Sequence, residues 1–195
     1  MIQPAILILA AGKSRRMLGR NKLLEYVGGQ PLVAKVTHRA HSLGHPTYVV
    51  TAFGDTAVQT ALTGQSVTQV VLPDEAPLMS NSLRHGIAAL PQTISHVMIL
   101  LADMPNIDTQ DMRQMLAGIA QTPDQILRGA APDGTAGHPV IFPQRLFTKL
   151  QHLSGDKGAQ SVMTGENIRL IPLPLGHATT DLDTPEDWQK WRGET

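Results

Sequence analysis

The sequence predicts an α/β fold, built as a three-layer α/β/α sandwich around a mostly parallel sheet. Short apolar runs alternate along the chain with segments in which apolar residues recur at helical spacing. Residues 5–10 and 97–102 are continuously apolar, which is typical of strands that are buried on both faces. Because strands that alternate with helices usually pair in parallel, we expect helices on both faces of one sheet.

Seven segments are predicted as strands by their apolar character and by the turn residues that bound them. Pro73 stops the third of them, and the last alternates weakly, as an edge strand does. In such sheets ligands bind beyond the carboxyl ends of the strands, so motifs directly after a strand matter most. The predicted strands are residues 5–10, 48–52, 68–72, 97–102, 125–131, 139–142 and 168–173.

Helices are predicted between these strands from helical spacing and from residues that start or stop a helix. The clearest is capped by Asp108 or Thr109 and has apolar residues at i, i+3, i+4 and i+7. Pro31 opens an earlier helix, and Gly44 ends it. The predicted helical segments are residues 31–43, 55–62, 81–90, 109–119, 143–153, 157–163 and 184–191, with Asn81 as the expected cap of the third.

The composition indicates a single globular domain, residues 1–195. Lys and Arg total 16, Asp and Glu total 16, and the net charge is +0, so we expect no nucleic-acid or membrane partner. The chain has 0 cysteines, which excludes disulfides, thiolate metal sites and cysteine nucleophiles and fits a cytoplasmic location. The opening residues have no basic side chain before a short apolar run, so neither a signal peptide nor a membrane span is expected.

The loop after the first predicted strand contains Gly12-Lys13-Ser14, as a phosphate-binding loop would. In the Walker A pattern the first glycine would fall at position 7, which is a leucine inside the strand. No G-x-G-x-x-G dinucleotide pattern follows the strand either. The loop instead combines small residues with Arg16 and Lys22, which can hold phosphate oxygens. We interpret it as a triphosphate cradle of another design; the alternative is a turn with solvated cations.

The segment LAAGKSRRM at residues 9–17, followed by Lys22, resembles the signature of the nucleotidyltransferases that complete the molybdenum cofactor. It resembles more broadly the family that includes sugar-phosphate and methylerythritol-phosphate nucleotidylyltransferases. The form LAAG is typical of the cytidylyltransferases, whereas guanylyltransferase relatives more often carry LAGG. Later segments match the family patterns in order over nearly the whole chain. These are Met79-Ser80-Asn81-Ser82-Leu83-Arg84, Leu101-Ala102-Asp103-Met104-Pro105, Gly137-His138-Pro139-Val140, residues 155–159 and residues 181–187.

The resemblance implies a Rossmann-like sheet of the GT-A-like, nucleotide-diphospho-sugar transferase fold. It implies a nucleotide-binding half at about residues 1–105 and an acceptor-binding half at about 106–195. Catalysis is expected from Arg16, Lys22 and Asp103, with the two cations on the β and γ phosphates and on the departing pyrophosphate. The expected nucleotide-binding residues are Leu9, Ala10, Ala11, Gly12, Ser14, Arg16, Lys22, Asp74, Ser80 and Ser82.

Asp103 directly follows a predicted buried strand, where a carboxylate is costly unless it is paired or bound to a metal. Mg²⁺ prefers oxygen ligands and is usually held by one or two carboxylates together with substrate phosphates. The resemblance places a further metal carboxylate in the Asp-x-Asp-Thr-Pro segment, so Asp103 and Asp183 are expected to hold Mg²⁺. The alternative for Asp183 is that its segment is simply a helix start, with Thr184 capping and Pro185 in the first turn. Asp181 competes for the second ligand position. For Asp103 the alternative is a turn or cap residue.

His138 and Asp156 are expected on the acceptor side, and a surface-loop role for His138 stays open. Two positions depart from the family pattern: Leu78 stands where glycine is usual, and Gln160 stands where arginine is usual. The first departure bears on how the loop approaches the base, and the second on how the acceptor phosphate is held. Methionines that either line a soft acceptor pocket or simply pack are Met79, Met104 and Met163.

The activity that the resemblance implies is transfer of CMP from CTP to the phosphate of (molybdenum-)molybdopterin, with release of pyrophosphate. Such an acceptor is already an anion and needs no general base, and the chain has no G-x-S-x-G nucleophile motif. The alternatives are the same chemistry with GTP, a sugar or polyol phosphate acceptor, and a non-catalytic carrier of the cofactor. A molybdenum oxidoreductase that receives the product is the implied protein partner.

Overall fold

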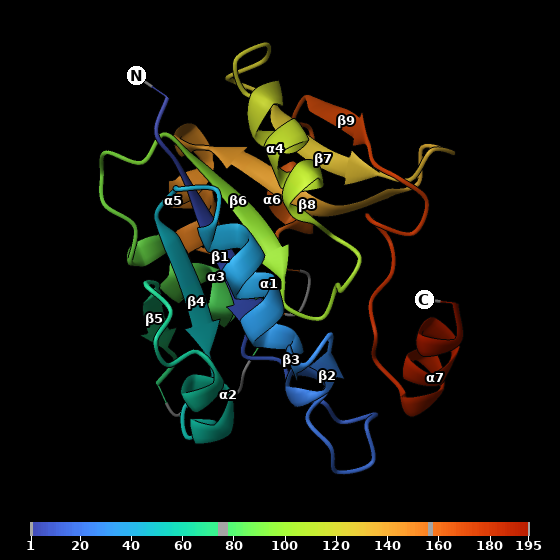
Figure 1. Cartoon of the computed structure of the whole chain (residues 1–195). Coiled ribbons are helices and arrows are strands. Elements are labelled where there is room, and N and C mark those ends of the chain that lie inside the picture. Colours follow the sequence, from blue (N-terminus) through green and yellow to red (C-terminus); the bar gives the residue numbers. More distant parts are fainter. Residues whose placement is uncertain (1, 74–77, 156–157, 195) are drawn as a thin grey trace.

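A computed structural model of the chain describes residues 2–73, 78–155 and 158–194 (Figure 1). Within them, seven strands form one sheet: β1 (Pro4–Ala10), β4 (Thr47–Thr51), β5 (Thr68–Val71), β6 (His96–Leu101), β7 (Ile126–Ala130), β8 (Ala136–Pro143) and β9 (Ile168–Pro172). Their order is β5-β4-β1-β6-β8-β7-β9. β8 is antiparallel to both of its neighbours, and the other adjacent pairs are parallel. The sheet is therefore mostly parallel, as predicted.

Each face of the sheet has its own apolar core, because successive side chains of β1 point to opposite faces. Ile6 and Ile8 belong to one core, while Ala5 and Leu7 belong to the other. Helices α1 and α4 cover the first core, and α3 and α5 cover the second, which gives three layers (Figure 1). The helices are α1 (Leu32–His41), α2 (Thr56–Ala61), α3 (Met79–Ala88), α4 (Thr109–Gly118), α5 (Phe147–Gln151), α6 (Gln160–Met163) and α7 (Pro185–Glu194).

The predicted strands agree with the structure to within three residues at each end, and β9 lies at a sheet edge. Asp108 caps α4 through a capping box with Asp111, which settles the choice between Asp108 and Thr109. The predicted helix at residues 143–153 is in two parts, because Pro143 ends β8 and a 3₁₀ turn, η2 (Gln144–Leu146), precedes α5. α6 begins at Gln160, later than predicted.

The prediction that Asn81 caps the third helix is wrong. α3 begins at Met79, and its N-cap is Leu78 in an extended conformation. The Leu78 carbonyl accepts hydrogen bonds from the N–H of Ser82 at 3.1 Å and from its hydroxyl at 3.4 Å. The helix therefore starts without a side-chain cap. Ser80 and Ser82 are buried in this first turn.

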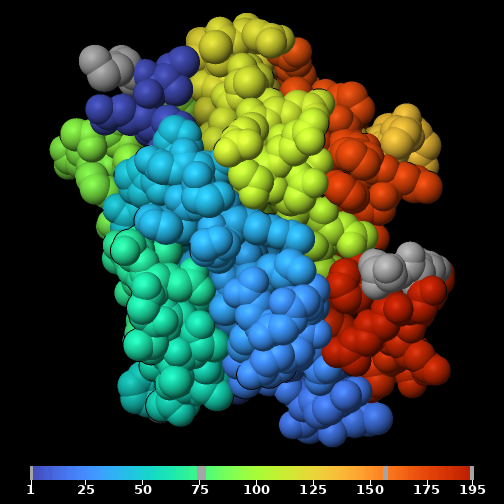
Figure 2. Space-filling view, in the orientation of Figure 1, coloured from blue at the N-terminus to red at the C-terminus, as the bar shows by residue number. Residues whose placement is uncertain are grey.

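The sequence did not predict a small two-stranded hairpin. It comprises β2 (Tyr26–Val27) and β3 (Gln30–Pro31), joined by Gly28 and Gly29 at φ values of 62° and 86°. A 3₁₀ turn, η1 (Lys22–Leu24), precedes it. The C-terminal helix α7 lies beside this region, where Arg192 pairs with Glu25 at 2.9 Å, and Figure 2 shows the two segments in contact. None of the described helices has the length and apolar character of a membrane span.

Candidate active site

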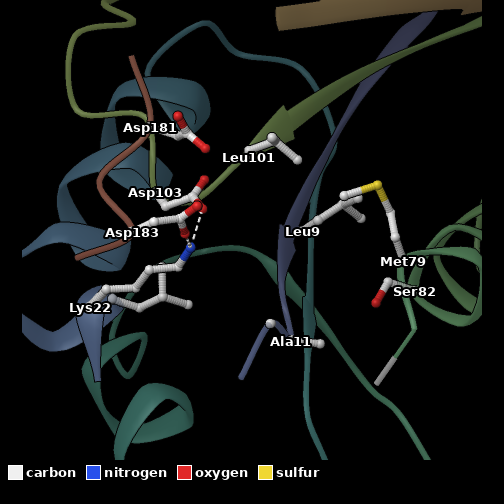
Figure 3. Close-up of a pocket in the computed structure, with 11 residues that line it drawn as sticks. Leu9, Ala11, Lys22, Met79, Ser82, Leu101, Asp103, Asp181 and Asp183 are labelled. Carbon is white, nitrogen blue, oxygen red and sulfur yellow. Dashed lines mark hydrogen bonds and ion pairs between the residues drawn. The ribbon is translucent and has the colours of Figure 1, made fainter. Parts of the chain in front are cut away.

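A pocket of about 300 Å³ opens beyond the carboxyl ends of β1 and β6. These two strands are parallel neighbours, so their carboxyl ends meet at one edge of the sheet. Figure 3 shows Lys22 and three aspartates on one wall, with Met79 and Ser82 on the opposite wall. The lining residues are Leu9, Ala11, Gly12, Lys22, Leu23, Met79, Ser82, Leu101, Asp103, Asp181 and Asp183.

The first loop, residues 11–21, is held by its own polar side chains. The Ser14 hydroxyl accepts a hydrogen bond from the Lys22 N–H at 3.0 Å. The Asn21 carboxamide accepts from the Leu23 N–H at 3.0 Å and thereby caps η1. An open space surrounds Gly12, since a Cβ built there would meet nothing within 4 Å. The loop therefore fixes the backbone of Lys22 and leaves room beside Gly12.

An acidic centre forms where the segment after β6 meets the segment before α7. The Leu182 N–H donates to the Asp103 carbonyl at 3.2 Å, which brings the two segments together. Lys22 Nζ donates to Asp103 Oδ2 and, at 2.6 Å, to Asp183 Oδ1. Arg16 donates to the other oxygen of Asp183. One lysine from the first loop thus joins two carboxylates that are far apart in the sequence.

The start of α7 leaves the Asp183 carboxylate free to face this centre. The Thr184 hydroxyl accepts from the Asp187 N–H at 3.1 Å, and the Asp187 carboxylate accepts from the N–H groups of Asp183 and Thr184. These reciprocal bonds form a capping box in which the Asp183 side chain takes no part. The segment is thus a helix start with Thr184 as the capping side chain, and the Asp183 carboxylate is still left to face the acidic centre.

Gly137 on β8 allows the chain that leads to this segment to approach the sheet. A Cβ built on Gly137 would lie 1.8 Å from the Ala178 carbonyl oxygen. The neighbouring His138 N–H donates to the same oxygen at 2.8 Å. The family-like Gly-His-Pro-Val segment thus has a packing role, because a side chain at position 137 would push away the strap that leads to Asp181 and Asp183.

The pKa shifts of Lys22, Asp181 and Asp183 follow from which of their charges are paired. Burial raises the pKa of Asp181, and the nearby carboxylates of Asp183 and Asp103 raise it further. Burial alone would also raise the pKa of Asp183, but its contacts with Lys22 and Arg16 outweigh burial and lower it. Burial alone would lower the pKa of Lys22, and the two aspartates outweigh that effect and raise it. Asp183 and Lys22 are thus held as an ion pair, while Asp181 faces like charges.

The donor set of this centre fits a hard divalent cation. Asp103 Oδ1 is buried and has no hydrogen-bond partner within the described residues, so one strong acceptor is left for a ligand. The carboxylates of Asp103, Asp181 and Asp183 line the same pocket. Carboxylate oxygens are the ligands that Mg²⁺ and Mn²⁺ prefer. The residues present therefore fit the metal that the sequence predicted.

Among the described residues, the one group of three possible metal ligands whose ligand atoms all converge lies at the start of α4, not in the first pocket. The ligand atoms of Asp108, Asp111 and His177 are within 4.8 Å of one another. Here the Asp108 and Asp111 carboxylates already cap α4, and Asp111 also contacts His177 Nδ1 at 2.7 Å. These contacts explain why the three side chains lie together: they cap α4 and anchor the loop at His177 to it.

A second pocket of about 260 Å³ adjoins the first and shares Leu9, Met79 and Leu101 with it. Its polar side chains are Arg128, His138 and Gln160, among the described residues that line it. The other lining residues are apolar: Leu9, Met79, Leu83, Ile99, Leu101, Val140, Phe142, Ala159 and Met163.

His138 is neutral in this second pocket at physiological pH. Burial, and secondarily the charge of Arg128, lower its pKa to about 4. Its Nδ1 is buried and has no hydrogen-bond partner in the described parts of the chain. One nitrogen of the Arg128 guanidinium already has a partner, since Nε donates to the Gly137 carbonyl at 3.0 Å. The pocket is thus lined by a neutral imidazole on a mostly apolar wall.

The structure brings together seven of the predicted site residues around the first pocket: Leu9, Ala11, Gly12, Lys22, Ser82, Asp103 and Asp183. Ala10 and Ser80 are buried beside it, with exposed fractions of 1% each. Ser14 acts within the loop, Arg16 reaches the centre from the exposed side, and His138 lies in the second pocket. The predicted residues Asp74 and Asp156 lie outside the described residues.

Other residues of the two pockets were not predicted. Leu23 and Arg128 belong to no motif, and only the fold brings them to the pockets. Met79 and Met163 line the second pocket, whereas Met104 is buried in the core with an exposed fraction of 2%. The methionines therefore divide between the two alternatives that the sequence left open.

Comparisons with known proteins identify the family of the chain. The family model described as the MobA-like NTP transferase domain matches residues 6–170. A probable molybdenum cofactor guanylyltransferase of Nostoc sp. is 24% identical over 195 residues, which cover 96% of this chain and 90% of the relative. The bifunctional protein GlmU of Clavibacter sepedonicus is 30% identical over 183 residues, and the match covers 88% of this chain but only 35% of GlmU.

Solved structures show the same fold. Rv0371c of Mycobacterium tuberculosis H37Rv superposes with a TM-score of 0.86 at 23% identity, covering 99% of this chain and 100% of that chain. Another structure of Rv0371c, a complex with manganese, has a TM-score of 0.82 at 22% identity and covers the same shares. A CMP:2-keto-3-deoxy-manno-octonic acid synthetase complexed with CTP has a TM-score of 0.78 at 16% identity, covering 98% of each chain. From the family match, the chain belongs to the MobA-like NTP transferase domain family.

Proposed function

We propose that the protein is a nucleotidyltransferase that moves CMP from CTP to the phosphate of a molybdopterin-type acceptor. The products are a molybdopterin cytosine dinucleotide and pyrophosphate. The acceptor phosphate oxygen forms a bond to the α-phosphorus while the bond to the pyrophosphate oxygen breaks, so no residue has to remove a proton. Membership of the family supports nucleotidyl transfer, and the choice of CTP rests on the LAAG form of the first loop.

The observation that carries the proposal is the meeting of the first loop with the acidic centre in one pocket. Lys22 and Arg16 are cations beside Ala11 and Gly12, where backbone N–H groups and open space suit a phosphate chain. Phosphoryl transfer is catalysed mainly by positioning and by neutralising charge on the phosphates. In the proposed roles Lys22 and Arg16 stabilise the departing pyrophosphate.

Asp103 and Asp183 are the proposed ligands of Mg²⁺, and Asp181 is available as a further ligand from the same segment. A bound Mg²⁺ would supply charge neutralisation at the reacting phosphates. The unpartnered oxygen of Asp103 supports this assignment. The manganese complex of Rv0371c is in line with a divalent cation in this fold, although the shared 22% identity transfers no residue roles.

The second pocket is the proposed place of the acceptor. Three polar side chains stand among apolar and sulfur-containing ones, so the faces of a flat ring could pack on the apolar wall while a few hydrogen bonds orient its edge. His138 is proposed to contact the acceptor from the wall of this pocket, and Gln160 replaces the arginine that relatives usually carry.

A guanylyltransferase is the second candidate, favoured by the Nostoc relative that is described as a probable molybdenum cofactor guanylyltransferase. The GlmU match points to sugar-phosphate acceptors, but it covers only 35% of that protein. A non-catalytic cofactor carrier would have no use for a lysine and carboxylates beside a triphosphate cradle.

A thermal-shift panel with the Mg²⁺ complexes of CTP, GTP, ATP and UTP tests the donor. A ligand that binds only the folded state at about 100 times its Kd stabilises it by about 2.7 kcal/mol. The proposal expects the largest rise in Tm with CTP, and pyrophosphate release when a molybdopterin acceptor is added. The largest rise with GTP would move the assignment to a guanylyltransferase, and no rise with any nucleotide would favour the carrier.

A further inference from the structure

The ammonium group of Lys22 is the counter-cation of the acidic centre. Its Nζ donates to Asp103 Oδ2 and, at 2.6 Å, to Asp183 Oδ1. Figure 3 shows both carboxylates converging on this one nitrogen, with Asp181 nearby on the same wall. Lys22 therefore lies between the same two carboxylates that are proposed to hold the divalent cation.

An ammonium and a divalent cation are incompatible at this position. The side chains of Lys22 and Asp103 are only 11% and 16% exposed, so water screens their charges weakly. A divalent cation beside the ammonium would face a strong like-charge repulsion. Entry of the metal is therefore favoured once Lys22 Nζ has left the two carboxylates.

Lys22 is built so that its side chain can leave while its backbone stays. The backbone N–H is tied to the Ser14 hydroxyl, and the Asn21 cap holds the turn that Lys22 begins. The lysine stem is a flexible chain of four carbons, unlike the rigid fork of an arginine. Lys22 lines the same pocket as Ala11 and Gly12, so a triphosphate against the first loop would give the released ammonium new anionic partners.

We infer that this centre accepts a divalent cation only together with a triphosphate, because Lys22 exchanges its two carboxylates for phosphate oxygens. This inference rests on the proposed function. It means that the acidic centre binds the metal–triphosphate complex rather than the free metal ion. Without a triphosphate, withdrawal of Lys22 would leave a shielded ammonium with no counter-charge. With a triphosphate, every charge keeps a partner, and each ligand raises the affinity of the other by the same factor.

Direct Mn²⁺ binding to the whole chain tests this, with the free ion followed by electron paramagnetic resonance. Titrations are made with and without α,β-methylene CTP and corrected for the Mn²⁺–analogue complex measured without protein. We expect wild type to bind Mn²⁺ at least about tenfold more tightly when the analogue is present. Without the analogue, Lys22→Met is expected to bind Mn²⁺ at least about tenfold more tightly than wild type.

Two matched variants separate charge from packing. Lys22→Arg keeps a cation at the same place and is expected to bind free Mn²⁺ as weakly as wild type. Lys35→Met removes the same charge from α1, where Lys35 lines a different cavity, and is expected to behave as wild type. Circular dichroism confirms that each variant is folded. If Lys22→Met does not fold, the wild-type titrations with and without the analogue decide the matter.

Equal Mn²⁺ affinity of wild type with and without the analogue, or equal affinity of free wild type and Lys22→Met, would overturn the inference. The proposed function would survive either result, since metal and nucleotide would still bind. Failure of every sample to bind Mn²⁺, with the analogue included, would overturn the metal part of the proposed function together with the inference.

Discussion

The two adjoining pockets differ in how they are charged. The first is lined by Lys22, Asp103, Asp181 and Asp183, and a lysine joins two of these carboxylates. The second has Arg128 as its one ionised side chain at neutral pH among the described residues, because His138 is neutral there. The two share an apolar border, so charged and nearly neutral chemistry lie side by side.

This difference indicates how each pocket would bind its ligand. A charged pocket binds a ligand by matching charge, and it tolerates the loss of a carboxylate poorly. A mostly apolar pocket binds by shape and by a few hydrogen bonds, so single polar changes have smaller effects. Substitutions in the two pockets are therefore expected to differ in size and in their dependence on salt and pH.

The largest effect is expected for Asp103→Asn. The change keeps the shape of the side chain but removes one charge from the proposed metal site. Turnover, measured as pyrophosphate release, is expected to fall by at least about 10²-fold. The thermal midpoint without ligands is expected to fall as well, since Lys22 loses one of its two carboxylate partners, so turnover is compared at a temperature at which the variant is folded.

The matched control for this variant is Asp133→Asn, since Asp133 is exposed in the loop between β7 and β8. The control is expected to keep wild-type turnover. Wild-type turnover of folded Asp103→Asn would remove the metal role from this residue and with it the contrast between the pockets.

An intermediate effect concerns His138 and the pH dependence of folding. Its pKa is about 4 in the folded protein and about 6.5 when unfolded, so the unfolded chain binds the proton more tightly. Stability is therefore complete above pH about 6.5 and is lost as pH falls towards 4, by up to about 3 kcal/mol. Denaturant unfolding at several pH values measures this loss, and His138→Gln is expected to reduce it.

The exposed His152 on the surface supplies the comparison for this prediction. His152→Gln is expected to keep the wild-type pH profile of stability. Identical profiles for wild type and His138→Gln would mean that His138 is not held neutral by its pocket, and the second pocket would then be more polar than described.

The smallest effect is expected for Gln160→Arg, which adds a cation at the exposed rim of the second pocket. An exposed ion pair contributes at most about 1 kcal/mol, so the KM for an anionic acceptor should fall by no more than about fivefold. The gain is expected to vanish at high salt. Gln151→Arg, exposed at the end of α5, is the control and should leave the KM unchanged. A fall in KM that persists at high salt would contradict this account.

The sheet could be predicted because its signals are local. Apolar runs such as residues 5–10 and 97–102 reveal buried strands without any knowledge of their partners. The hairpin β2–β3 was missed because two-residue strands carry no periodicity, although its Gly28-Gly29 turn is a known hairpin signal. The start of α3 was misplaced because the helix begins at Met79 after Leu78 with no side-chain cap, so no capping residue marks its start.

The site could be predicted only where its residues lie in motifs. Lys22, Asp103 and Asp183 each follow a recognisable segment, yet the contact among them depends on the fold that joins three distant parts of the chain. Arg128 lies within a strand and matches no motif, so only strand pairing places it in the second pocket. Side chains that reach a site through tertiary packing leave no trace in local sequence.

Anomalous diffraction from crystals grown with Mn²⁺ and α,β-methylene CTP tests the central claim most directly. The account predicts a Mn²⁺ peak coordinated by Asp103 and Asp183, with the triphosphate against the first loop and Lys22 Nζ on its phosphate oxygens. A peak confined to Asp108, Asp111 and His177, with Lys22 still paired to both aspartates beside a bound nucleotide, would contradict it.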